Sequence, residues 1–195
     1  ELEAVCLHAG VLLYAGSPLP EHRARAQAVA QDAAARFDTP AACLAAGAMA
    51  LERANESEGP ARTVCVKQAL AHFHAATRKA PDEAVTWLNL AYVAQRLGAR
   101  GVERECLAQA LQSQGTALGA WFLGHVADPY FVDWRRALAE RKAGAAILHA
   151  AADARRAAMA LEDGDPAAAR ESAEASMARH PVVSTAYRLA GAAAL

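Results

Sequence analysis

The chain has 195 residues, of which 54% are hydrophobic and only 6% aromatic, and its 20 Lys and Arg residues nearly balance 21 Asp and Glu residues. Alanine occupies 55 positions, whereas Val, Ile and Thr together occupy 19. Alanine favours helices and β-branched residues favour strands, so this composition predicts an all-α protein and argues against a β-sandwich or a doubly wound sheet. The near-zero charge provides no one-signed field, so neither nucleic acid nor an anionic bilayer is an expected partner.

Turn and breaker residues divide the chain into segments whose length is typical of helices rather than strands. These residues cluster at 16–20, 38–40, 57–60, 81–82, 98–101, 113–115, 128–129, 164–166 and 180–181. Between the clusters, apolar residues recur with the helical period, as at Trp87, Leu90, Ala91 and Ala94. We therefore expect about ten to eleven helices with short connections and no strand.

Several helix ends can be placed from local signals. Thr39 precedes Pro40, and Asp165 precedes Pro166. In each pair a side chain that can cap a helix comes directly before a proline at the first helical position. Gly98 and the glycine at 164 lie where a helix should stop.

Two segments share a spacing that suggests a repeat. Trp87 follows Pro81 by six residues, and Tyr187 follows Pro181 by six residues. The segment 84–117 also carries Leu90, Ala91, the turn glycine Gly98, Leu107 and Ala110, and the preceding segment carries Ala69, Phe73 and Ala76 before Pro81. This pattern resembles the tetratricopeptide repeat, a 34-residue helix–turn–helix unit in which small residues on one helix face large residues on the next. The segment departs from the family at Ala94, where a tyrosine is usual, and at Glu103, where a small residue is usual.

The resemblance implies a right-handed α-solenoid of antiparallel helix pairs spanning the whole chain as one domain. The expected units are a divergent helical pair at 1–39, repeats at 40–83, 84–117, 118–149 (degenerate) and 150–183, and the start of a further unit or a capping helix at 184–195. Stacked units of this kind form a curved inner wall, which implies a groove for a peptide or a partner's helix.

The sequence contains no recognisable catalytic or cofactor motif. A phosphate-binding loop, a zinc-protease helix and a nucleophile elbow are all absent, and the four cysteines lack zinc-site spacing. His149 and Asp153 are four residues apart and could share a surface hydrogen bond. We therefore predict a non-catalytic protein without a metal or cofactor. Four reduced, mostly buried thiols would fit a cytoplasmic location.

Two groups of residues are candidates for partner binding. The first is one side of the helix that begins near residue 84, and it comprises Leu88, Asn89, Tyr92, Gln95 and Arg96. The resemblance implies that Asn89 could hydrogen-bond a bound peptide backbone, although Asn89 and Gln95 could equally be ordinary surface. The second comprises Trp121 and Phe122, in a stretch to Trp134 that holds five of the eleven aromatics. These aromatics would either fill a broken repeat or form a partner-facing patch.

The expected function is protein–protein interaction, as an adaptor, scaffold or chaperone-like subunit of bacterial style that holds a protein or peptide segment in its groove. One alternative is an accessory or regulatory helical region of a larger enzyme or secretion-type assembly. Another is a helical enzyme whose residues converge from distant helices. The uncapped last helix would also allow a homodimer, and the lack of an apolar run of about 18 residues predicts no membrane insertion.

Overall fold

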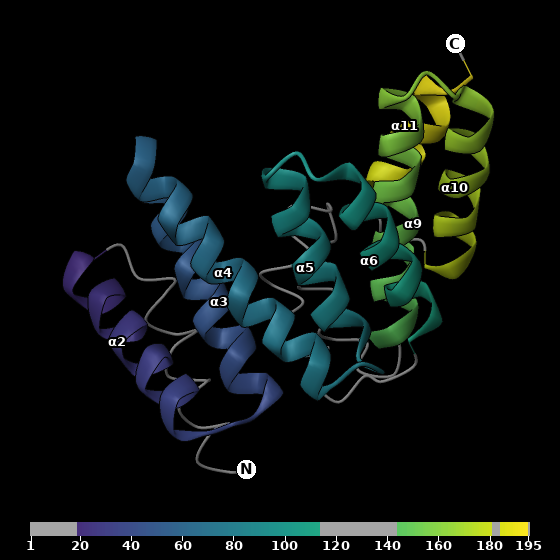
Figure 1. The fold of residues 1–195 in the computed structure, drawn as a ribbon. Coiled ribbons are helices and arrows are strands. Elements are labelled where there is room, and N and C mark those ends of the chain that lie inside the picture. The colour runs from purple at the N-terminus through teal and green to yellow at the C-terminus, as the bar shows by residue number, and fades with distance from the viewer. Residues whose placement is uncertain (1–18, 114–143, 181–183, 195) are drawn as a thin grey trace. The chain divides into compact units, whose positions relative to one another are not determined.

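A computed structural model of the chain describes residues 19–113, 144–180 and 184–194, which form eight α-helices and no β-strand (Figure 1). The predicted all-α class is therefore confirmed. The expectation of ten to eleven helices refers to the whole chain and stays a prediction; the described ranges contain eight helices, and the first 18 residues and most of 118–149 lie outside those ranges. The chain divides into two compact units, one made of Glu1–Pro81 with Val93–Gly98 and the other of Asp82–Tyr92 with Ala99–Leu195.

The first unit contains α2 (Pro20–Arg36), α3 (Pro40–Glu56) and α4 (Gly59–Lys79), and α3 packs against both of the others. Each helix has a proline in its first turn, where the missing N–H removes no hydrogen bond. The Thr39 hydroxyl accepts a hydrogen bond from the Ala42 backbone N–H at 3.3 Å, which confirms the predicted cap of α3.

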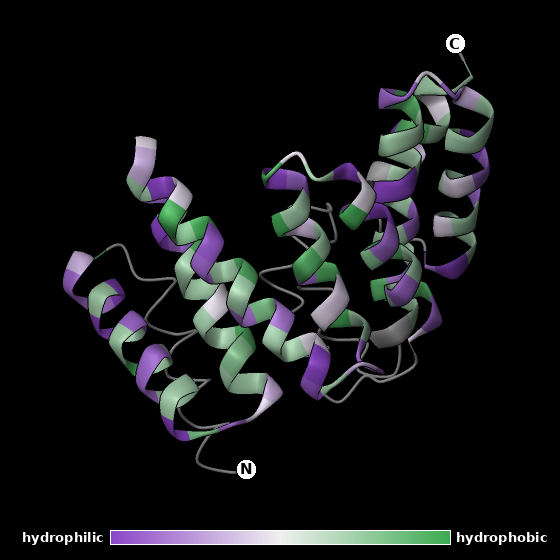
Figure 2. Cartoon of the chain, in the orientation of Figure 1, coloured by the Kyte–Doolittle hydropathy of each residue, from purple (hydrophilic) through white to green (hydrophobic). Residues whose placement is uncertain are grey.

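Helix α3 is the centre of this unit, and hydrophobic residues run along most of its length (Figure 2). It buries eleven residues, most of them alanine. The ring of Phe73 on α4 lies against Gly47 on α3 so closely that a Cβ atom at Gly47 would stand 2.3 Å from the ring. Phe73 has no exposed surface. A small residue thus admits a large one, the kind of packing expected from the alanine-rich sequence.

The second unit contains α6 (Arg100–Gln112), α9 (Gly144–Glu162), α10 (Pro166–Arg179) and α11 (Ser184–Ala192). Helix α9 packs against α6, α10 and α11, and the antiparallel pair α9 and α10 is visible side by side in Figure 1. The turn between α9 and α10 contains Gly164 at a φ of 76°, a backbone conformation that favours glycine. The Asp165 carboxylate accepts a hydrogen bond from the Ala168 N–H at 3.0 Å, so the second predicted cap is also confirmed.

Helix α5 (Ala84–Arg96) is followed by Gly98 at a φ of 69°, as predicted for a helix stop. Residues 84–92 of this helix group with the second unit, and residues 93–96 group with the first. Apolar residues are buried on all of its sides, including Val85, Leu88, Leu90 and Val93. A helix that is buried all round contributes mainly to the core.

Candidate functional site

A groove with a volume of about 570 Å³ lies between α6, α9 and α10 in the second unit. Each helix contributes one stripe of residues at helical spacing. The lining residues are Arg104, Ala108, Leu111 and Gln112 of α6, Arg156, Met159 and Ala160 of α9 with Asp163 just after it, and Asp165, Ala168 and Ser172 at and after the start of α10. Because residues three and four apart lie on one face of a helix, the groove follows the local sequence period on all three helices.

The middle of the groove is apolar. Ala108, Leu111, Met159 and Ala160 come from two helices that face each other, and Ala168 adds a third side. Met159 is buried, whereas Ala108 is exposed and Leu111 is half-buried. The floor therefore consists of small and flexible apolar side chains, a composition that can adapt to a partner's side chains.

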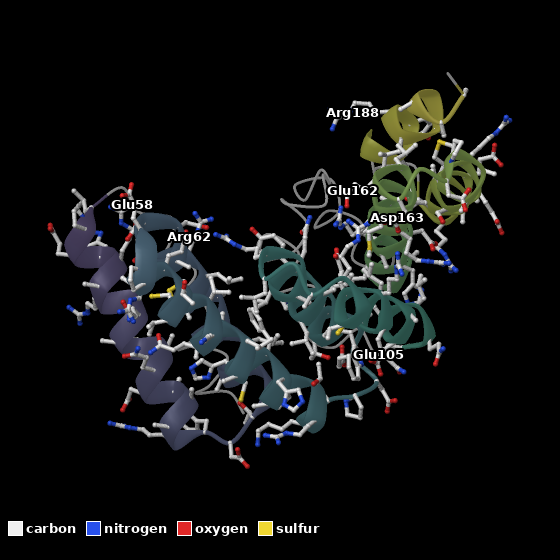
Figure 3. All side chains as sticks on the ribbon, turned by 45° about the horizontal axis from the view of Figure 1, so that its top comes forward. Glu58, Arg62, Glu105, Glu162, Asp163 and Arg188 are labelled. Atoms are coloured by element: carbon white, nitrogen blue, oxygen red, sulfur yellow. The ribbon has the colours of Figure 1, made fainter. Side chains whose placement is uncertain are left out.

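One end of the groove is closed by ion pairs between α6 and the end of α9. The Arg100 guanidinium donates to Glu162 at 2.8 Å and to the Met159 carbonyl at 3.2 Å, and it also contacts Asp163. Arg104 donates to the other oxygen of Asp163. Figure 3 shows Glu162 and Asp163 next to each other at the end of α9. The Met159 carbonyl also accepts from the Asp163 N–H at 2.9 Å, so Arg100 adds a second donor there, and the ion pairs hold the two helices together at this end.

Beneath these exposed pairs lies a buried one. Glu103 is 1% exposed, and Arg155, whose side chain is 9% exposed, donates to it from Nε at 2.6 Å. Arg155 also donates to Glu162 at 2.9 Å. Burial lowers the pKa of Arg155, but the hydrogen bonds to Glu103 and Glu162 and the negative charges of these two groups together outweigh that effect, so the pKa is raised overall. The hydrogen bond from Arg155 is the main cause that lowers the pKa of Glu162. Both groups are therefore held in their charged forms.

The opposite end of the groove has a different charge arrangement. Asp153 on α9 is 2% exposed and accepts a hydrogen bond from Arg179 of α10 at 2.7 Å. Arg156, which lines the groove and is 52% exposed, lies farther from the same carboxylate, at 3.4 Å. The buried carboxylate of Asp153 thus pairs with two guanidiniums, and Arg156 is the more weakly bound of them.

A smaller hollow of about 320 Å³ lies between α2 and α3 in the first unit. Its lining includes Arg23 and Glu56, which form an ion pair at 3.0 Å, and Arg53, Glu52 and Gln27. Charged and polar side chains make up most of its lining, and Pro20, Ala24 and Met49 supply the apolar part, so it is less apolar than the larger groove.

The sequence-based candidates on α5 occupy unequal environments. Leu88 has no exposed surface and Asn89 is 3% exposed, with its amide donating to the Val85 carbonyl of the same helix at 2.8 Å. Tyr92, Gln95 and Arg96 are half-buried. The Arg96 guanidinium donates to the Asn55 side chain. Accessible candidate surface on α5 is therefore provided by Tyr92, Gln95 and Arg96. Trp121 and Phe122 lie outside the described residues.

The possible hydrogen bond between His149 and Asp153 is absent. His149 Nε2 lies 2.8 Å from the Ser113 carbonyl just after α6, and Asp153 is used by the two arginines. The expectation of a surface contact was wrong because both side chains find partners on neighbouring helices. The contact from His149 to Ser113, together with that from Arg100 to Glu162, shows that α6 and α9 run antiparallel.

Within the described residues, no group of three or more His, Cys, Asp or Glu side chains is placed to hold a metal ion. In the same part of the chain, no helix combines the length and the hydropathy that crossing a bilayer requires. Cys43, Cys65 and Cys106 are free, buried thiols. Burial raises the pKa of Cys106 to about 11 and also raises the pKa of Cys43.

No family model matches the chain. A comparison with curated proteins likewise gives no significant sequence match. The assignment of function therefore depends on the residues and the geometry described above.

Sequence reasoning did not identify the groove between α6, α9 and α10. One signal was present, because Glu103 stands where the repeat pattern has a small residue. In the structure, the Arg155 guanidinium lies opposite Glu103 and donates a hydrogen bond to it, which explains why an acidic residue is found at this position. The 52 positions that separate these two residues explain why the pair could not be recognised from local spacing.

Proposed function

We propose that this protein is a non-catalytic interaction module of tetratricopeptide-like style, an adaptor or chaperone-like subunit that binds a segment of another protein. The observation that carries the proposal is the groove between α6, α9 and α10, with its apolar floor and its charged ends. Apolar floors with polar rims are typical of protein-binding surfaces, and a groove between helices suits a partner's helix. A cytoplasmic location agrees with the three free, buried thiols.

The packing of the second unit supports the proposal. Helix α9 is held by α6 on one side and by α10 on the other, through Arg155 to Glu103 at 2.6 Å and through the Ser176 hydroxyl to the Ala150 carbonyl at 2.6 Å. The helices that line the groove are thus cross-linked by buried polar contacts. A surface fixed in this way loses little conformational entropy when a partner binds, which favours affinity.

Site-specific photo-crosslinking tests the proposal. A photoreactive amino acid replaces Ala108 in the groove, and the matched control carries it at Glu105, an exposed position on the same helix that does not line the groove. Figure 3 labels Glu105 on α6. In extracts of the native host, we expect a discrete crosslinked partner from position 108 and little from position 105. An Ala108→Trp variant, which fills the groove, should abolish binding of that partner.

Equal crosslinking from both positions, or undiminished binding to the Ala108→Trp variant, would refute binding in this groove. The same experiment with Tyr92→Ala examines the candidate surface on α5. If Tyr92→Ala abolishes binding of the partner and Ala108→Trp does not, the binding surface is the one on α5 that was expected from the sequence. Circular dichroism of each variant confirms that the helices remain folded.

A further inference from the structure

The two ends of the groove between α6, α9 and α10 differ in charge. At the end where α9 stops, three guanidiniums (Arg100, Arg104 and Arg155) pair with three carboxylates (Glu103, Glu162 and Asp163), and a fourth carboxylate, Asp165, lines the groove. At the other end, Arg156 and Arg179 share the single carboxylate of Asp153. Among the described residues, one end therefore carries an excess negative charge and the other an excess positive charge.

The excess charges can be assigned to two groove-lining residues. The pairs within the first cluster use Asp163 twice and Glu162 twice, whereas the Asp165 carboxylate accepts a backbone N–H at the start of α10. At the second end, Arg179 has the closer contact with Asp153, at 2.7 Å against 3.4 Å for Arg156. Asp165 and Arg156 thus hold the charges that a ligand in the groove could best complement.

We propose, building on the function proposed above, that the partner segment is an amphipathic helix with an acidic residue that contacts Arg156 and a basic residue that contacts Asp165, separated by about seven residues. Arg156 and Asp163, which follows the last residue of α9, are seven positions apart, about 10 Å along a helix axis. The Asp165 N–H donates to the Ala160 carbonyl at 2.8 Å, so Asp165 lies at this same end of α9. Residues i and i+7 of a partner helix lie on one face at the same separation, with apolar residues at i+3 and i+4 above the groove floor.

A peptide-display selection against the full chain tests this proposal. Random 16-residue peptides are selected on the wild-type protein, and the enriched peptides are synthesised and measured by fluorescence anisotropy. We expect an enriched pattern of an acidic residue, two apolar residues and a basic residue at i, i+3, i+4 and i+7. Exchanging the acidic and basic residues of a selected peptide should weaken binding about tenfold, because both end contacts become repulsive.

Charge-altered variants connect that pattern to the two named residues. Arg156→Glu should bind the charge-exchanged peptide more tightly than the wild-type protein does, a reversal that a merely structural role would not produce. Asp165→Asn retains a side chain able to cap α10, and it should weaken binding of the originally selected peptide about threefold. Arg170→Gln, an exposed site on α10 outside the groove lining, is the matched control and should leave both affinities unchanged.

The outcomes separate this inference from the proposed function. The charge assignment is wrong if the selected peptides lose binding to Ala108→Trp but show no preference for an acidic residue at i and a basic residue at i+7. It is also wrong if Arg156→Glu does not bind the charge-exchanged peptide more tightly. In either case, binding in the groove remains supported. If no selected peptide depends on Ala108, both proposals fail. If Arg156→Glu instead changes the concentration dependence of the chain's mass in light scattering, the groove is occupied by a second copy and the inference is overturned.

Discussion

The contact between α3 and α4 in the first unit and the contact between α6 and α9 in the second join helices in different ways. The first is apolar, and it depends on the absence of a side chain at Gly47, which lets the Phe73 ring approach. The second buries a charged pair, Glu103 with Arg155, beneath a layer of exposed ion pairs. An apolar contact is governed by shape, whereas a buried charge requires its specific counter-charge.

The strongest test of this difference is removal of one member of the buried pair. We expect Arg155→Met to destabilise the protein by about 3–5 kcal/mol, because Glu103 would remain buried without its partner. Urea unfolding followed by circular dichroism measures the change. The double variant Glu103→Leu with Arg155→Met should recover most of the loss. A single variant as stable as the wild type would show that Glu103 is not buried as described.

The apolar contact should be most sensitive to added volume. At Gly47, an alanine Cβ would collide with Phe73, and we expect a steric cost of about 1–3 kcal/mol. This cost should exceed the gain of about 0.5–1 kcal/mol that alanine brings to a helix interior. Gly101→Ala on α6 is the matched control, since no atom other than those of its own helix backbone and chain neighbours lies within 4 Å of its Cβ position, and it should stabilise the protein. A Gly47→Ala variant more stable than the wild type would contradict the tight packing.

Acid should weaken the contact between α6 and α9. The folded-state pKa of Glu162 is lowered, mainly by the hydrogen bond from Arg155, so its contribution is complete above the ordinary value near 4.5. That contribution is lost as the pH falls through the folded-state pKa. Between pH 6 and pH 3.5, the urea midpoint of the wild type should therefore fall more than that of Glu162→Gln. Parallel pH profiles for the two proteins would exclude this role of Glu162.

Thiol labelling compares the two contacts through one buried cysteine in each, and it is expected to show the smallest difference. With the pKa of Cys106 raised to about 11 by burial, only about one molecule in a thousand carries the thiolate at pH 8, and native Cys106 should react very slowly. Burial also raises the pKa of Cys43 on α3. In a Cys6→Ser background, mass spectrometry after labelling at increasing urea concentrations should show which thiol becomes reactive first. Fast labelling of both thiols in the native protein would contradict their burial.

Much of the local structure could be predicted from the sequence. The caps at Thr39 and Asp165 and the stops at Gly98 and Gly164 depend on residues within a few positions of one another, and all four are confirmed. Alanine content and the helical period were likewise sufficient to predict the all-α class. The stacking of units into a solenoid is a longer-range property, and it stays a prediction.

The candidate site could not be predicted in the same way. Helical period alone does not show which sides of α5 are covered, and Leu88 and Asn89, assigned to a partner-facing side, are in fact buried. The groove requires residues near 104, 159 and 165 to meet, which is decided by packing between helices and not by local spacing. Glu103 departs from the repeat pattern in the sequence, but its partner Arg155 lies on another helix and is shown only by the packing of α6 against α9.

The buried pair has a consequence for how such a chain could grow. An alanine-rich helix face imposes few demands on the helix that packs against it, so a hairpin held only by such faces could be copied without leaving a charge unpaired. A copied α9–α10 hairpin would carry Arg155 to a position where a neighbouring helix lacks an acid that matches Glu103. The cost of an isolated buried charge would penalise such a copy, so the buried pair favours keeping α9 next to a helix that carries its acid.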